Sequence, residues 1–300
     1  MSRPLFAVVN PAAGGGRCGK LAVAALERLR RAGVPLEAHE TRGPGDGIRL
    51  ARQAYCAGFR RFLAVGGDGT SCEIVNGIFP QALGGELPQL AFLPLGTGNS
   101  FLRDFTTCGI EHATETLLAG RARPCDVLLM THREGVLYYI NLLSLGFAAD
   151  VAFLRHRRFQ RYGELGYLLA LLTCLARLER RPFPLRVDSN PEYDRRPCLF
   201  LTFNNSKFTG GKMMIAPNAD PCDGLIEYVR WGPISRLGLL ANLHTLYTGT
   251  HVQHPLASRQ AVRQVEFQLD APVNVMVDGE VLKLQCQRLD VLPGVLEVMA

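Results

Sequence analysis

Three short apolar runs near the start of the chain each lead into a glycine-rich turn. The runs are Leu5–Val9, Arg61–Val65 and Leu90–Leu95, and the turns begin at Asn10, Gly66 and Gly96. An apolar run of this length before a glycine-rich turn is typical of a buried parallel strand. Because ligands bind beyond the carboxyl ends of such strands, we expect the three turns to meet at one ligand-binding edge.

Helical patterns alternate with these strands. The sequence predicts helices over Lys20–Ala32, Asp46–Ala57 and Ser71–Ile78, and a further strand over Leu36–Thr41. Strands that alternate with helices imply a parallel, doubly wound sheet with right-handed crossovers. We therefore predict an α/β domain over residues 1–125.

The pattern changes near Asp126, where short β-rich runs separated by turn residues begin. These runs are Val127–Met130, Leu137–Leu142, Cys198–Phe203, Leu225–Val229, Val265–Leu269, Val273–Val277 and Leu289–Leu292. They favour an antiparallel sandwich or barrel over residues 126–300, interrupted by one helical stretch from Phe153 to Arg180. A length of 300 residues suits two domains.

The turn Gly66-Gly67-Asp68-Gly69-Thr70 has the local context of a phosphate-binding loop, since it lies between a predicted strand and a predicted helix. Asp68 would repel a bare phosphate, so its presence points to a bound cation or to proton transfer. A plain strand-to-helix connection is the alternative for one isolated turn, but three such loops on one edge favour a ligand site. A P-loop is absent from the sequence.

The amino-acid composition limits the cellular compartment and the kinds of partner that we expect. The nine cysteines are scattered without a C-x-x-C pair, which argues against a disulfide framework and a zinc site and favours a reducing, cytoplasmic compartment. No window approaches the about 18 apolar residues of a membrane span, so membrane contact would be peripheral. The basic cluster at residues 155–158 and Arg161 would attract phosphate, acidic lipid or nucleic acid, but no nucleic-acid recognition motif accompanies it.

Five motifs together resemble the diacylglycerol kinase catalytic-domain family, which includes bacterial lipid kinases and the sphingosine and ceramide kinases. They are residues 10–16 (Asn-Pro-Ala-Ala-Gly-Gly-Gly), 66–70 (Gly-Gly-Asp-Gly-Thr), 94–99 (Pro-Leu-Gly-Thr-Gly-Asn), 216–225 (Ala-Pro-Asn-Ala-Asp-Pro-Cys-Asp-Gly-Leu) and 278–280 (Asp-Gly-Glu). The glycine–aspartate turn is shared with NAD kinases and phosphofructokinases, whereas the set of five is much more specific to lipid kinases. The resemblance implies an α/β nucleotide domain, an antiparallel β-sandwich domain that binds the lipid substrate and an active site in the cleft between them. It leaves open that the C-terminal segment returns to the first domain.

The resemblance also implies roles for individual residues, with ATP and Mg²⁺ as cofactors. Glu280 would be the catalytic base, with Asp68 as its aid, and Asp126 and Asp278 would belong to a network of acids around the site. Without the resemblance, an acid beside a hairpin turn such as Glu280 would be taken as solvated. Metal would bind at Asp220, Asp223 and Leu225. Nucleotide contacts would come from Asn10, Pro11, Ala12, Ala13, Gly14, Thr41, Gly66, Gly67, Asp68, Gly69, Thr70, Ser71, Cys72, Glu73 and Thr97.

One position departs from the bacterial pattern: Ser100 stands where many bacterial relatives have an acid. Three functions stay open. The first is an ATP-dependent lipid kinase acting on a lipid such as diacylglycerol or a sphingoid base, which would be cytoplasmic with peripheral contact at a membrane surface and with a homodimer as an option. The second is a kinase of a soluble substrate such as NAD or a sugar phosphate. The third is a nucleotide-binding regulatory protein without turnover, which Ser100 favours.

Overall fold

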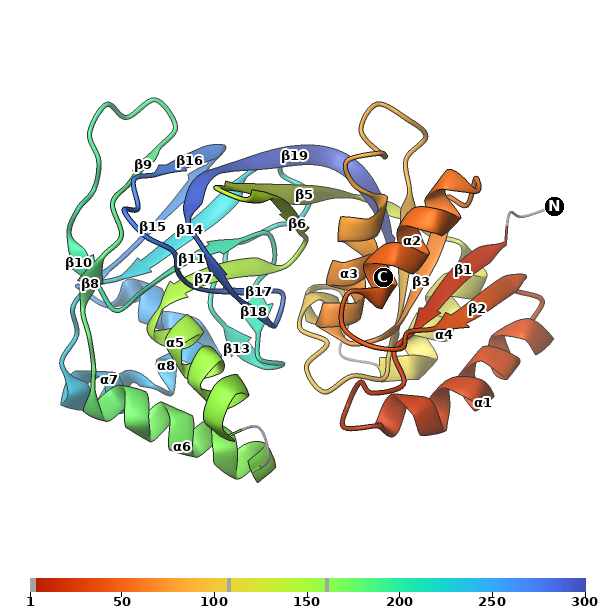
Figure 1. Cartoon of the computed structure of the whole chain (residues 1–300), viewed down its shortest axis with the longest axis horizontal. Helices are drawn as coiled ribbons and strands as arrows, with labels where there is room; N and C mark the ends of the chain where they lie inside the picture. Colours follow the sequence, from red (N-terminus) through yellow and green to blue (C-terminus); the bar gives the residue numbers. More distant parts are fainter. Residues whose placement is uncertain (1–3, 107–108, 160–161) are drawn as a thin grey trace. The chain divides into compact units, whose positions relative to one another are not determined.

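The computed structural model describes residues 4–106, 109–159 and 162–300, and the chain forms two compact units (Figure 1). The first unit contains the described residues up to Val127, together with Tyr138–Ile140 and Leu292–Ala300. The second contains Leu128–Leu137 and Asn141–Val291. An α/β unit and an antiparallel β unit confirm the predicted fold class. The domain boundary predicted after residue 125 stays a prediction.

The first unit is built on a parallel sheet with strand order β2-β1-β3-β4. Its elements in chain order are β1 (Leu5–Val9), α1 (Arg17–Arg31), β2 (Leu36–Glu40), α2 (Asp46–Cys56), β3 (Arg61–Gly66), α3 (Asp68–Ile78), β4 (Gln89–Pro94), η1 (Phe101–Asp104) and α4 (Gly109–Ala119). The end of a further strand, β19 (Cys286–Met299), pairs in parallel with β4. The order of strands and helices agrees with the sequence prediction as far as β4.

Helices cover both faces of this sheet, which explains why β1 and the buried residues of β3 and β4 are apolar. On one face, Leu5 and Leu63 pack in a core cluster with Leu26 of α1 and Leu117 of α4. On the other face, α2 and α3 pack against each other and both contact β1. All five residues of β1 are buried, so no position in the strand is left for a polar side chain.

Helix α3 begins at Asp68, three residues before the predicted start at Ser71. Gly67 precedes it in an extended conformation (φ −125°, ψ −166°). The second half of the glycine–aspartate turn is therefore already the first turn of the helix. This first turn lies at the end of β3, and the N-terminus of a helix favours anions.

The second unit is built on an antiparallel sheet with strand order β15-β14-β11-β7-β17-β18. Strands β16, β9 and the first part of β19 pair with one another outside it. From β5 onward the elements are β5 (Arg123–His132), β6 (Gly135–Tyr139), β7 (Leu142–Gly146), α5 (Phe147–Leu154), η2 (Arg155–Phe159), α6 (Gly163–Ala176), β8 (Arg181–Pro182), β9 (Leu185–Val187), β10 (Pro197–Cys198), β11 (Phe200–Asn204), β12 (Phe208–Thr209), β13 (Met213–Met214), β14 (Ile226–Trp231), α7 (Arg236–Asn242), α8 (Thr245–Thr248), η4 (Thr250–Gln253), β15 (Ala257–Val262), β16 (Gln264–Phe267), β17 (Val273–Val277) and β18 (Glu280–Leu284).

Two predicted elements of this unit were wrong in detail. The strand predicted over Leu137–Leu142 is the end of β6 and the start of β7, because the chain between them turns so that Asn141 and Leu142 donate their N–H groups to Asp278. The single predicted helical stretch divides into α5, the π-helical turn η2 and α6. Arg161 of the predicted basic cluster lies outside the described residues. None of the described helices is both long and apolar enough to cross a bilayer.

Candidate active site

The three glycine-rich loops converge at the carboxyl edge of the first sheet, as predicted. Asn10 donates its N–H to the carbonyl of Val65 at 2.9 Å, and Leu95 and Gly96 donate theirs to the carbonyl of Gly66 at 2.9 and 2.7 Å. A Cβ atom on Gly96 would lie 2.5 Å from Cα and 2.8 Å from N of Gly67. Glycine at position 96 is therefore required for the loops to touch.

Asp68 is held by the loop that follows β4. Its Oδ2 accepts the N–H of Ser100 at 2.9 Å and its Oδ1 accepts the N–H of Phe101 at 3.3 Å. Burial raises the pKa of Asp68, while the N–H groups of Ser100 and Phe101 and the Ser100 side chain act in the opposite direction by favouring the charged carboxylate.

The contact with Asp68 gives a structural reason for a serine at position 100. Its side chain is buried, with 2% exposed, and forms a hydrogen bond with the Asp68 carboxylate. An acid at position 100 would place a second negative charge beside Asp68 and raise the pKa further. The neutral Ser100 avoids that repulsion and donates its backbone N–H to the carboxylate.

The residues after Asp68 turn their side chains inward. Ser71 donates its hydroxyl to the Asp68 carbonyl at 2.8 Å, and Cys72 is buried against the core. Thr70 is also buried, and its Oγ1 has no hydrogen-bond partner in the described part of the chain. The backbone N–H groups of Thr70 and Ser71 donate to the Gly67 carbonyl at 2.9 and 3.3 Å, so they are not free to bind a ligand. Thr97, in the loop after β4, is exposed.

A fourth loop, between β2 and α2, contacts this edge of the sheet through Glu73 of α3. The Glu73 carboxylate accepts the N–H groups of Gly45 and Gly47 at 2.7 and 2.8 Å and so caps the start of α2. Thr41 donates its N–H to the Val9 carbonyl at 2.8 Å. Sequence reasoning missed the contact of Glu73 because the partners are 28 and 26 residues apart and no local pattern links them.

The acids predicted in the second half are also anchored to backbone groups. Asp278, with a φ of +46° and 2% exposure, accepts the N–H groups of Asn141 at 3.1 Å and Leu142 at 3.0 Å. It thereby fastens the β17–β18 hairpin, whose second strand begins with the exposed Glu280. Asp126 accepts the N–H of Gly294 at 2.8 Å within the first unit.

The predicted metal ligands lie in one turn before β14. Asp220 accepts the N–H of Cys222 at 3.0 Å, Asp223 accepts the N–H of Leu225 at 2.9 Å, and both carboxyl groups are exposed. No three His, Cys, Asp or Glu side chains converge as metal ligands would among residues 4–106, 109–159 and 162–300. Two carboxylates and a carbonyl nevertheless fit Mg²⁺, which binds through one or two carboxylates and keeps several waters. In the sheet, three strands separate β14 from β18, where Glu280 lies.

Comparison with known proteins agrees with this arrangement. Residues 4–130 match the family model described as the diacylglycerol kinase catalytic domain. Residues 141–300 match the YegS C-terminal NAD kinase beta sandwich-like domain. The fold and the converging loops thus define a kinase built from an α/β unit and a β-sandwich unit.

Similar proteins extend over nearly the whole chain. A diacylglycerol kinase of Mycobacterium tuberculosis is 28% identical over 296 residues, 98% of this chain and 94% of that protein. A probable lipid kinase YegS-like protein of Chromohalobacter salexigens is 31% identical over 274 residues, 91% of this chain and 86% of its own. The chain belongs to the diacylglycerol kinase catalytic-domain family.

A solved structure shares the fold. The crystal structure of a diacylglycerol kinase from Bacillus anthracis matches with a TM-score of 0.70 at 18% identity, covering 99% of this chain and 96% of that one. Membership of this family supports a lipid kinase.

Proposed function

We propose that the protein transfers the γ-phosphoryl group of ATP to a hydroxyl of a lipid, such as diacylglycerol or a sphingoid or glycerolipid alcohol. The observation that carries the proposal is the convergence of the loops after β1, β3 and β4 around Asp68. Their backbone N–H groups and the first turn of α3 suit the polyphosphate of a nucleotide. The family to which the chain belongs supports a lipid as the acceptor.

In this proposal the loops orient the phosphates, and donors fixed before the reaction stabilise the charge that develops during transfer. Glu280 accepts the proton of the attacking hydroxyl as a general base. The N–H groups of Ser100 and Phe101 favour the ionised form of Asp68, against the burial that raises its pKa. Asp220, Asp223 and the carbonyl of Leu225 would hold Mg²⁺, which when bound neutralises negative charge. That Glu280 of the second unit and the loops of the first serve one catalytic centre is part of the proposal.

The acceptor class can be tested by incubating the protein with γ-labelled ATP, Mg²⁺ and either a mixed lipid extract or NAD. We expect label in an organic-phase product that mass spectrometry identifies as a phosphorylated lipid. Label transferred to NAD would favour the soluble-substrate kinase instead. Nucleotide binding without any Mg²⁺-dependent ATP consumption would favour a regulatory protein.

A membrane-facing surface on the second unit would bring the protein to its acceptor. Leu165, Leu168 and Leu172 of α6 are 57%, 48% and 50% exposed, and their spacing of three and four residues places them on one side of the helix. Two leucines of α7, Leu237 and Leu240, are 79% and 47% exposed. We call these five leucines the apolar ridge.

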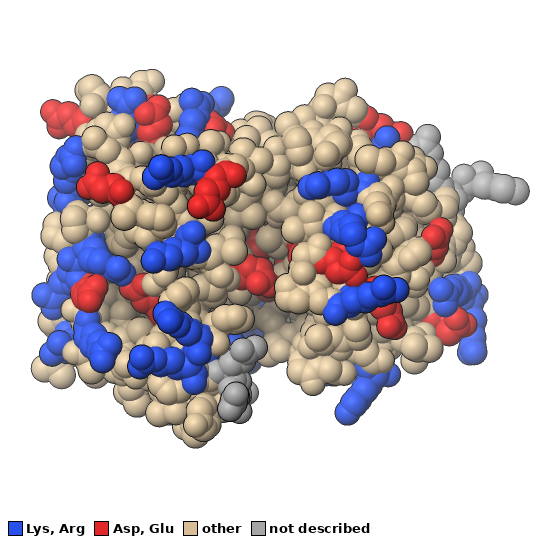
Figure 2. Space-filling view, in the orientation of Figure 1, with Lys and Arg blue, Asp and Glu red and all other residues tan. Residues whose placement is uncertain are grey.

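The two helices that carry the apolar ridge contact each other, and a basic turn precedes α6 in the chain. Leu175 of α6 packs against the core cluster that contains Leu239 of α7, and Arg236 donates to the Ala176 carbonyl at 2.7 Å. The exposed residues Arg155, His156, Arg157 and Arg158 form η2, between α5 and α6. Figure 2 shows basic side chains gathered over this region. Apolar side chains beside a basic cluster suit the surface of an anionic bilayer.

Replacing Leu168 and Leu172 together by serine is expected to weaken binding to anionic vesicles by about tenfold or more, because each buried leucine contributes roughly 1.5–3 kcal/mol. Vesicle co-sedimentation at low and high salt measures this. Leu87→Ser in the first unit, where the leucine is 45% exposed, is the control and should bind like the unmodified protein. Equal binding by all three proteins would show that the apolar ridge does not contact lipid.

A further inference from the structure

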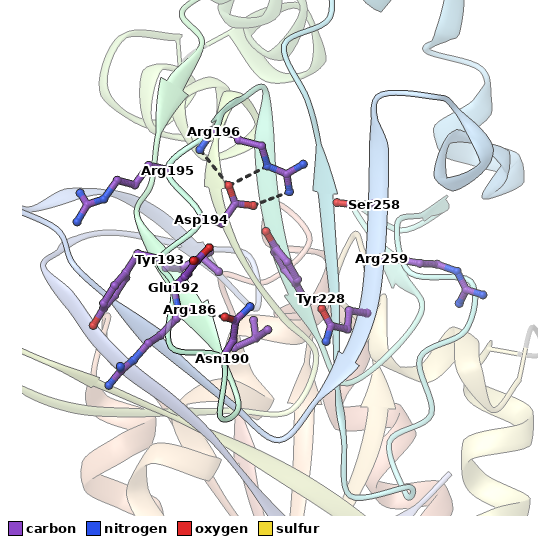
Figure 3. Close-up of a pocket in the computed structure, with 13 residues that line it drawn as sticks. Arg186, Asn190, Glu192, Tyr193, Asp194, Arg195, Arg196, Tyr228, Ser258 and Arg259 are labelled. Atoms are coloured by element: carbon purple, nitrogen blue, oxygen red, sulfur yellow. Dashed lines mark hydrogen bonds and ion pairs between the residues drawn. The ribbon is translucent and has the colours of Figure 1, made fainter.

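A polar cavity of about 450 Å³ lies wholly within the second unit, between the loop that joins β9 to β10 and strands β14 and β15 (Figure 3). Asn190, Asp194 and Arg196 come from the loop, Tyr228 from β14 and Ser258 from β15. None of the site residues predicted from the sequence lines it. Four arginines and two acids contribute to the lining, and two of these arginines pair with acids outside it, Arg186 with Glu266 at 2.6 Å and Arg259 with Glu227 at 3.2 Å.

One carboxylate in this cavity forms ion pairs with two guanidinium groups. Oδ1 and Oδ2 of Asp194 accept Nε and Nη2 of Arg196 at 2.9 and 2.7 Å. Oδ2 also lies 3.8 Å from Nε of Arg230, whose side chain is 6% exposed and donates to the carbonyls of Arg196 and Pro197. Buried charges are normally paired. Here the buried Arg230 and the Arg196 side chain, which is 68% exposed, share one negative charge, so the cluster carries an excess positive charge that solvent reaches at Arg196.

Tyr228 adds a hydrogen-bond donor without a partner. The residue is 6% exposed, and its hydroxyl forms no hydrogen bond within the part of the chain that the structure describes. Its ring stacks on Phe203 with centroids 5.2 Å apart, which fixes the direction of the hydroxyl. In Figure 3 the Tyr228 ring lies beside the Asp194–Arg196 pair, while Arg195 and Arg259 project away on opposite sides. A buried hydroxyl left unpaired is unfavourable unless something else accepts its proton.

We propose that this cavity binds a phosphate-bearing ligand, with the phosphate on Arg196 and the Tyr228 hydroxyl. Such an anion would neutralise the excess charge of the Arg196–Asp194–Arg230 cluster and accept the hydrogen bond that Tyr228 offers. The volume leaves room for an organic group beyond the phosphate. A metal cation does not suit the cavity, because the two guanidinium groups already compete for its central carboxylate.

The inference does not depend on the kinase activity and is tested by ligand binding. Isothermal titration calorimetry measures the affinity for two soluble phosphates, inorganic phosphate and glycerol 3-phosphate. Co-sedimentation with phosphatidic acid vesicles measures the affinity for a phosphate headgroup in a membrane. The variants are Arg196→Gln, which leaves Asp194 to neutralise Arg230, and Tyr228→Phe, which keeps the stacked ring. Thermal denaturation of each variant checks that it folds.

Arg288→Gln is a matched control. Arg288 is exposed and pairs with Asp290 two residues away, as Arg196 pairs with Asp194, but it lies outside the cavity. We expect Arg196→Gln to weaken binding by about tenfold or more and Tyr228→Phe by about threefold or more, since charged partners make the strongest hydrogen bonds. Arg288→Gln should bind like the unmodified protein.

Calorimetry and co-sedimentation together distinguish a soluble phosphate ligand from a lipid headgroup. A loss confined to soluble phosphates would identify a small phosphorylated metabolite as the ligand, and a loss confined to vesicles would identify a lipid headgroup. Either loss supports the inference. If folded Arg196→Gln and Tyr228→Phe proteins bind both kinds of phosphate as tightly as the Arg288→Gln control, the inference is overturned.

Discussion

Replacing Glu280 by glutamine is expected to lower kcat for lipid phosphorylation by about a hundredfold or more, because a general base typically contributes roughly 10²–10⁴. Glu280 is exposed at the start of β18, so the change of one oxygen to an amide nitrogen should leave the melting temperature nearly unchanged. Steady-state kinetics at saturating ATP, with the lipid that the labelling experiment identifies as the acceptor, measures the loss.

Glu134→Gln serves as the control for this prediction, since Glu134 is an exposed acid at another turn, between β5 and β6. Its kcat should equal that of the unmodified protein. If the Glu280→Gln protein turns over at a near-normal rate, Glu280 is not the proton acceptor. In that case the remaining candidate is Asp68.

The second large effect is expected for Asp68→Asn, with kcat reduced by about a hundredfold to a thousandfold, the range found when a fixed polar group is removed from an active site. An amide can accept from Ser100 or from Phe101, but its NH₂ group then faces the other N–H. We therefore also expect a loss of stability of about 1–3 kcal/mol. Urea denaturation measures the stability and steady-state kinetics the turnover.

Ser100→Ala gives the matching, milder change. Burial already raises the pKa of Asp68, and the Ser100 side chain opposes that rise. Removing the hydroxyl should raise the pKa further, so the carboxylate becomes protonated at a higher pH. If ionised Asp68 is required, activity is present above this pKa and is lost as pH falls through it. The acid limb of the pH profile of kcat/KM should then move to higher pH. If the limb does not move, the ionisation of Asp68 does not control kcat/KM.

The α/β unit could be predicted closely from the sequence because its order is local. A parallel strand covered on both faces must be apolar throughout, and Leu5–Val9 shows this directly. The glycines after such strands mark the loops, and topology brings the loops together. The start of α3 was misplaced because Asp68, Gly69 and Thr70 read as a turn, although they are its first helical residues.

Contacts between distant residues could not be predicted. Nothing near Glu73 signals that it caps α2, and nothing near Tyr228 or Arg230 signals that Asp194, more than thirty residues earlier, lies beside them. The cavity in the second unit therefore escaped sequence reasoning altogether. The roles assigned to Glu280, Asp220 and Asp223 rest on the family motifs, because single acids in turns carry no local signal of function.

The last strand has a consequence for how the protein is made. Residues 297–299 of β19 lie alongside Gln89–Ala91 of β4, and Gln89 donates to the Glu297 side chain 208 positions later. During synthesis the N-terminal sheet must leave the ribosome with one side of β4 bare, and exposed strand edges invite wrong pairing. The sheet can therefore be completed only after residues 297–299 have been synthesised.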